Sequence, residues 1–134
     1  MKNLFKLIAA ALFTFGIGST AMAQQPTFDQ GWTILEESAN QVDVSYAVVQ
    51  CTAGTSEIHL HVFNENPTAQ VVNFTIEVTN PADGSTASHA VSNLNMSLGE
   101  MIQAECGSSA NANLKFAVPA GFDPTALTVD ITYN

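Results

Sequence analysis

The chain has 134 residues, of which 46% are hydrophobic, and it carries 12 acidic against 3 basic residues for a formal charge of −9. This charge excludes a basic nucleic-acid binder, because an acidic surface repels phosphate instead of releasing its counterions. The hydrophobic fraction excludes a disordered acidic tail, and the lack of heptads or of a three-residue glycine period excludes coiled coil and collagen.

Residues 1–23 have the order of an export signal. Two lysines precede the apolar run Leu7–Phe15, and Ala21-Met22-Ala23 supplies a small-x-small cleavage site. The run is shorter than the roughly 20 apolar residues that a transmembrane helix needs. We therefore expect cleavage between Ala23 and Gln24, a periplasmic or extracellular location, and no membrane span in the mature chain.

Removal of this segment makes the remaining chain more acidic. Residues 24–134 hold all 12 acidic residues against Lys115 alone, a formal charge of −11. Such a surface disfavours nucleic acid and anionic lipid, and it attracts metal cations or basic proteins. An acidic surface that serves solubility alone is the alternative.

The rest of the chain alternates between apolar and polar residues with period two, which is typical of strands with one buried face. The clear windows are Val42–Val48, Ile58–Val62, Val72–Val78, Leu114–Val118 and Leu127–Tyr133. Weaker windows cover Trp32–Glu36, Ala87–Val91 and Met101–Cys106. Turn sequences such as Asn80-Pro81-Ala82-Asp83-Gly84 separate them.

These windows predict an all-β fold with a single antiparallel two-sheet β-sandwich of about seven or eight strands, immunoglobulin-like or fibronectin III-like, over residues 24–134. Two sheets are needed because each strand has one apolar face, and face-to-face packing buries both sets at once. A small barrel is the alternative. No repeat, linker or low-complexity segment divides the chain, so we expect one domain.

Cys51 and Cys106 are the only cysteines, and each ends a predicted strand. An even number in an exported chain predicts a disulfide bond. The alternative, a redox or metal-binding thiol, lacks a C-x-x-C motif and a nearby basic residue that would stabilise a thiolate. Strict alternation places Cys51 with Val49 on the face opposite Val42–Val48, so we expect either a β-bulge or a position at the rim of the sandwich.

Four short features together resemble small exported β-sandwich proteins of Bacteroidetes. They are Gly31-Trp32, the strand from Tyr46 to Cys51, the strand Ile58–Asn66 with its Asn64-Glu65-Asn66 end, and Leu98-Gly99-Glu100 followed by Cys106. Leu98 stands where those proteins have proline. The resemblance covers most of the mature chain, and it implies a two-sheet fold with a disulfide bond without supplying an activity.

His59-Leu60-His61 is the most suggestive group for chemistry. Residues i and i+2 of a strand point the same way, so both imidazoles could reach one Zn²⁺ or Cu²⁺ ion. Further candidate ligands are His89, Met96, Met101 and Glu57. Because two imidazoles do not complete a closed site of four ligands, we expect structural or solvated histidines and no cofactor. A periplasmic metal-binding protein that uses His59 and His61 is the alternative.

Enzymatic motifs are missing from the sequence. No G-x-S-x-G elbow is present, Asp83-Gly84 lacks the repeated acids of a calcium loop, and the absence of arginine removes the usual clamp for anionic substrates. We therefore expect a noncatalytic exported module, structural or bound to an unidentified protein or envelope component. A small hydrolase that uses two carboxylates is the least favoured alternative, and the oligomeric state stays open.

Two modes of binding fit such a module, and we favour the first, because the strands lack lysine while the acidic residues are dispersed along the sequence. The strands carry almost no lysine, the residue that commonly guards exposed sheet edges, so a partner strand could add to an edge. The candidate edges are the first and last predicted strands, Trp32–Glu36 and Leu127–Tyr133. The acidic surface is the other candidate, and it would give association that weakens with salt.

Overall fold

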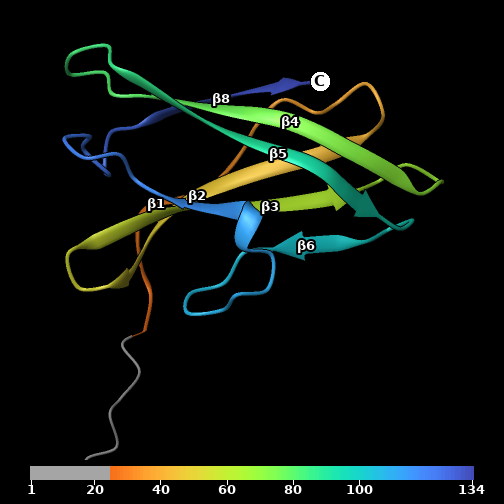
Figure 1. Ribbon diagram of the computed structural model, residues 1–134, viewed down its shortest axis with the longest axis horizontal. Helices are drawn as coiled ribbons and strands as arrows, with labels where there is room; N and C mark the ends of the chain where they lie inside the picture. Colours follow the sequence, from red (N-terminus) through yellow and green to blue (C-terminus); the bar gives the residue numbers. More distant parts are fainter. Residues whose placement is uncertain (1–24) are drawn as a thin grey trace, which may run out of the picture.

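The computed structural model describes residues 25–134 (Figure 1). The predicted signal segment 1–23 and its cleavage site between Ala23 and Gln24 lie outside the described residues. Residues 25–134 form eight strands and one short 3-10 turn, in the order β1 (Thr27–Ile34), β2 (Val42–Thr52), β3 (Thr55–Asn64), β4 (Gln70–Thr79), β5 (Thr86–Met96), β6 (Met101–Gln103), η1 (Ala112–Leu114), β7 (Lys115–Ala117) and β8 (Thr128–Tyr133).

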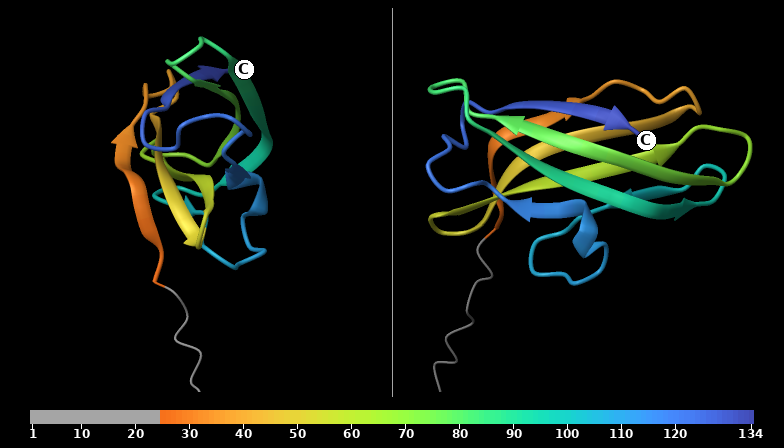
Figure 2. Two further views of the ribbon diagram at one scale, coloured as in Figure 1. Left: turned by 90° about the vertical axis from the view of Figure 1, so that its left-hand side faces the viewer. Right: turned by 45° about the horizontal axis from the view of Figure 1, so that its top comes forward.

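The strands make two antiparallel sheets, which lie as two layers in Figures 1 and 2. Sheet A has the order β1-β2-β3-β6, with β7 also paired to β3, and sheet B has the order β5-β4-β8. The predicted two-sheet sandwich is therefore confirmed, and the barrel alternative is wrong. The strand order differs from that of immunoglobulin domains: here β1, β2 and β3 pair consecutively, whereas immunoglobulin domains place their fifth strand beside the second.

The hydrophobic core lies between the sheets, where alternation predicted it. The inner face of sheet A contributes alternate residues of β2 and β3, and sheet B contributes alternate residues of β4 with parts of β5 and β8. Its largest fully buried side chains are Phe74, Ile58, Leu60, Ile76, Met96 and Leu114. Burial of both apolar faces at once is what holds the two layers together.

The hairpin of β2 and β3 positions most of the candidate residues. Its turn contains Gly54, whose φ of +78° lies in the left-handed region that glycine adopts without strain. The register is constant as far as the pair Gln50↔Ser56 and then shifts, so that Thr52 pairs with Thr55 and Cys51 is the extra residue. A β-bulge is one of the two explanations predicted for Cys51: the register does shift at this residue, and its sulfur lies on the outer face beside His59.

Three of the weaker strand predictions had wrong bounds. The first strand begins at Thr27 and ends at Ile34, and β5 runs on to Met96. The strand from Met101 ends at Gln103, so Cys106 lies in the turn that follows and does not end a strand. Ala104 is buried in the core, and its N–H still donates to the carbonyl oxygen of Leu60 at 3.1 Å; the turn that follows contains Gly107, whose φ of +70° lies in the left-handed region.

Within the described residues, no helix has the length and apolar character that crossing a membrane requires.

Candidate functional site on the outer face of sheet A

Sheet A has an outer face, turned away from sheet B, and the candidate residues of β2 and β3 lie on it. Leu60 of β3 points into the core, so His59 and His61 point outward. The register places Ala47 opposite His59 and Ser45 opposite His61. The expectation that both imidazoles share a face is therefore confirmed.

A disulfide bond joins Cys51 and Cys106, whose Cα atoms are 5.4 Å apart, as the cysteine count predicted. It connects the end of β2 to the turn after β6, and so it crosses the outer side of β3. Disulfide bonds persist in oxidising compartments, which indicates a non-cytoplasmic location.

His59 is buried beside this bond, with only 3% of its surface exposed. Its Nε2 atom lies 2.9 Å from Oε2 of Glu57 and 3.6 Å from Sγ of Cys51. The imidazole N–H donates to the carboxylate, and the carboxylate oxygen is itself 3.4 Å from Sγ of Cys51. The bridged sulfur has no proton to donate, so this last approach is a contact and not a hydrogen bond.

His61 has a different environment. Its ring packs edge-to-face against Trp32 of β1, with 6.0 Å between the ring centroids and an interplanar angle of 70°. Of the two histidines, only His59 belongs to the group of convergent ligand atoms found in residues 25–134, which also contains Cys51 and Cys106. The imidazoles thus share a face but have separate partners.

Two adjoining hollows form a groove on this face, which we call the outer groove. One, of about 300 Å³, is lined by Trp32, Ser45, His61 and Gln103. The other, of about 180 Å³, also touches Trp32 and Gln103 and extends over His59 to Phe28 and Cys106. The groove therefore has an aromatic wall on the β1 side, the chain after β6 on the other side, and polar atoms on its floor.

Exposed apolar side chains border the outer groove. Phe28 is 54% exposed, Trp32 42%, Ile34 77% and Met101 62%. Their positions follow from register, since Phe28 pairs with Val49, Ile34 with Ser45 and Met101 with Phe63, all of which face outward. We call these four residues the apolar rim.

The remaining sequence candidates lie elsewhere or have structural roles. His89 of β5 stacks on Phe116 at 4.3 Å between centroids, and its Nε2 atom is 2.8 Å from the carbonyl oxygen of Asn113. Met96 is buried in the core. Asp83 accepts hydrogen bonds from the hydroxyl and then from the backbone N–H of Ser85, and these lower the pKa of its carboxyl. The predicted turn at Asp83-Gly84 is confirmed.

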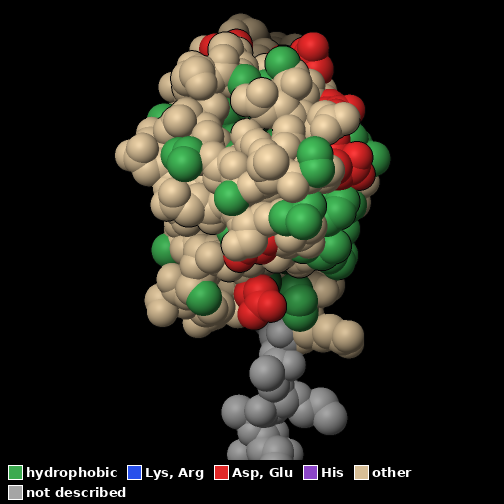
Figure 3. Space-filling view, turned by 90° about the vertical axis from the view of Figure 1, so that its right-hand side faces the viewer, with side chains coloured by type: hydrophobic (Ala, Val, Ile, Leu, Met, Phe, Trp, Pro, Cys, Tyr) green, Lys and Arg blue, Asp and Glu red, His purple; other side chains and the backbone are tan. Residues whose placement is uncertain are grey.

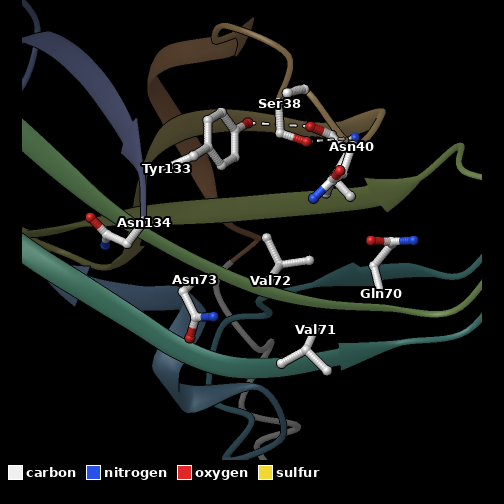
Figure 4. A pocket seen from close by; sticks show the side chains of 10 residues that line it. Ser38, Asn40, Gln70, Val71, Val72, Asn73, Tyr133 and Asn134 are labelled. Atoms are coloured by element: carbon white, nitrogen blue, oxygen red, sulfur yellow. Dashed lines mark hydrogen bonds between the residues drawn. The ribbon is translucent and has the colours of Figure 1, made fainter.

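A separate hollow of about 110 Å³ lies where the end of β8 meets the loop after β1 (Figure 4). The ring of Tyr133 points toward Ser38 and Asn40 of that loop, while Gln70 and Asn73 come from β4. The hydroxyl of Tyr133 donates to the carbonyl oxygen of Glu36 at 2.7 Å. Burial, with the nearby Asp43 carboxylate, raises the pKa of Tyr133 to about 12, which favours the protonated phenol that donates this hydrogen bond.

Both terminal strands lie at sheet edges, as predicted. β1 forms the margin of the molecule in Figure 2 and has two register shifts against β2, whereas β8 pairs with β4 without a shift. Acidic side chains stand at several separate places among polar and apolar groups on the end of the sandwich seen in Figure 3.

No protein-family model, no curated protein and no solved structure matches this chain.

Proposed function

We propose that the protein is a noncatalytic exported module that binds another exported protein or envelope protein through the outer groove and the apolar rim. The partner segment is extended, with apolar side chains and at least one basic residue. One observation carries the proposal: four of the six exposed large hydrophobic side chains in residues 25–134 belong to the apolar rim. Large exposed apolar side chains gathered on one face among polar groups are typical of interaction sites.

The residue types of the rim support a protein partner. Trp, Phe and Met are enriched in interface cores, and aromatic side chains supply a large share of binding energy when a partner removes them from water. Full burial of one such side chain contributes about 1.5–3 kcal/mol. Trp32 also has support from His61, which holds its ring at the edge of the groove, so it is preorganised and loses little side-chain freedom on binding.

Acidic residues near the outer groove are the reason that we propose a basic residue in the partner segment. Glu57 lies in its floor region, Asp43 points outward opposite Phe63, and Glu105 borders its far side. The one lysine of the described residues, Lys115, already donates to the carbonyl oxygens of Glu105 and Ser108 at 2.9 and 2.7 Å. A cationic side chain on the partner would meet Asp43 and Glu105 without competition from Lys115, whereas Glu57 already accepts a hydrogen bond from His59 at 2.9 Å.

The outer face of sheet A is a better candidate for the binding surface than the edge of β1. The two register shifts in β1 interrupt the ladder, and bulges are a recognised way to prevent strand addition at an edge. The edge of β8 is regular, and so strand addition there is the competing mode.

A quantitative pull-down from an envelope extract tests the proposal. The face variant carries Trp32→Ala and Ile34→Ser, and the control variant carries Val71→Ser and Leu98→Ser, which remove two exposed apolar residues from other surfaces. We expect parent and control to retain the same protein, with at least a tenfold loss for the face variant and no effect of a chelator. Equal retention by both variants would contradict the proposal.

A further inference from the structure

We propose that reduction of the Cys51–Cys106 disulfide by a dithiol opens a site for Zn²⁺, held by both thiolates, His59 Nε2 and the Glu57 carboxylate. The site lies under the 180 Å³ hollow of the outer groove, but the proposal does not rest on the function proposed above. In the oxidised protein the two sulfurs are bonded to each other and the site does not exist.

Convergence of ligand atoms is the first support. The ligand atoms of Cys51, His59 and Cys106 lie within 4.8 Å of one another. Zinc bond lengths of about 2.3 Å to sulfur and 2.0–2.1 Å to nitrogen or oxygen place sulfur about 3.5 Å from nitrogen, and about as far from oxygen, in a tetrahedral site. The distances from Cys51 Sγ are 3.6 Å to His59 Nε2 and 3.4 Å to Glu57 Oε2. Two of the three distances among these groups therefore already have zinc-like spacing. The third, 2.9 Å between His59 Nε2 and Glu57 Oε2, is a hydrogen-bond distance and must widen to about 3.3 Å when the ion replaces the proton between them.

The surroundings are the second support. His59 is nine-tenths buried or more, on a regular stretch of β3, so its imidazole has a fixed direction. Cys106 lies in the turn after β6 beside Gly107, where the backbone is not tied into a ladder. One thiolate can therefore move away from the other after reduction while the histidine and the strand ligands stay in place. The 180 Å³ hollow over His59 and Cys106 gives the ion a path from solvent.

The chemistry balances as follows. A dithiol gives two electrons and two protons to the S–S bond, which breaks into two thiols while the dithiol becomes a disulfide. Zinc then displaces the two thiol protons to water. The proton that His59 Nε2 donates to Glu57 moves to Nδ1, which leaves a lone pair for the metal without a change in the charge of the ring. Two thiolates and one carboxylate then give the zinc site a net charge of −1.

The choice of zinc follows from the ligands. Thiolates and imidazole select Zn²⁺ over Ca²⁺ and Mg²⁺, which prefer oxygen. His61 is not a ligand, because its ring is engaged with Trp32 and it lies outside the convergent group. This distinguishes the site from one that uses both histidines of His59-Leu60-His61.

The test is calorimetric titration of ZnCl₂ into the full mature protein, reduced with a non-chelating phosphine and, separately, oxidised. We expect one Zn²⁺ per reduced chain with a Kd below about 1 μM, and no stoichiometric binding to the oxidised chain. Co²⁺ in place of Zn²⁺ should give thiolate charge-transfer absorption only after reduction. Tight binding to the oxidised chain, or none to the reduced chain, would overturn the proposal.

Matched variants assign the ligands. His59→Gln and Cys51→Ser should each weaken Zn²⁺ binding by more than about 100-fold. Loss of a residue that only hydrogen-bonds to a metal ligand costs roughly 10–100-fold, so a larger loss identifies a direct ligand. His61→Gln should bind Zn²⁺ like the parent. If the reduced chain unfolds, Zn²⁺ should restore its near-UV circular dichroism. The site exists only in the folded chain, so the free energy of Zn²⁺ binding stabilises the fold. A reduced chain that stays unfolded with Zn²⁺, or equal losses in His59→Gln and His61→Gln, would overturn it.

Discussion

Removal of the disulfide bond should lower the free energy of unfolding by about 4 kcal/mol. The bond closes a loop across a sequence separation of 55 residues. In the chain-entropy description such a loop restricts the unfolded chain by about 14 cal/mol/K, which corresponds to about 4 kcal/mol at 25 °C. The double variant Cys51→Ala/Cys106→Ala therefore loses a large fraction of the stability expected for a small domain, about 5–15 kcal/mol.

Urea unfolding followed by Trp32 fluorescence measures this loss, since the chain has a single tryptophan. With a slope of about 1.5 kcal/mol/M, the midpoint should fall by roughly 2–3 M with the slope unchanged. The parent protein, reduced in the presence of a chelator, is the matched control and should unfold at nearly the same midpoint as the double variant. A fall of less than about 0.5 M would refute the view that the bond stabilises the protein through the unfolded chain.

Four further outcomes follow from the structure. Phe74→Ala should cost about 3–5 kcal/mol in urea unfolding, because the side chain is fully buried between the sheets. Asn64→Ala should cost about 1–3 kcal/mol by the same assay, because it removes a fully buried amide that donates to the carbonyl oxygens of Ser97 at 2.9 Å and Thr68 at 3.0 Å. The pKa of Tyr133 is raised from 10.0 in the unfolded chain to about 12 in the folded protein, so the protonated phenol stabilises the fold fully below pH 10, and this contribution is lost as the pH rises through 12. The urea midpoint of the parent should therefore fall between pH 10 and 12, and in Tyr133→Phe this pH dependence should be smaller. A folded Val129→Pro variant, altered in the edge strand β8, should bind the partner like the parent in the pull-down, and a loss of binding would favour strand addition there.

Sequence patterns predicted the fold well because the physics of a half-buried strand acts locally. Alternation in Val42–Val48 and Val72–Val78 identified the inner faces of β2 and β4 directly. The bounds of β1 were harder to predict, since two register shifts break its period and its apolar residues point outward. The order of strands in each sheet depends on long-range pairing, which no local pattern contains.

The candidate site was only partly predictable. Spacing placed Glu57, His59 and His61 on one face, and alternation placed Cys51 on the face opposite the core. Their convergence depends on the register of β2 against β3, and the position of Cys106 depends on a turn that the sequence had suggested was a strand. Alternation predicts on which side of a sheet a side chain lies, but it does not predict whether other parts of the chain cover that side chain. The exposure of the apolar rim was therefore not predicted. One signal could have helped: Ala47, Val49 and Phe63 make the outer faces of β2 and β3 apolar as well.

The emission of Trp32 tests the central claim most directly. This indole is the only one in the chain, is 42% exposed and stands in the wall of the outer groove. The measurement is a fluorescence titration of the mature protein with the partner recovered by pull-down, accompanied by acrylamide quenching and by calorimetry as an independent record of binding. Docking on the outer groove predicts a saturable blue shift of emission and reduced quenching, with the same Kd as the calorimetric one. Calorimetric binding that leaves both the emission maximum and the quenching of Trp32 unchanged would contradict the account.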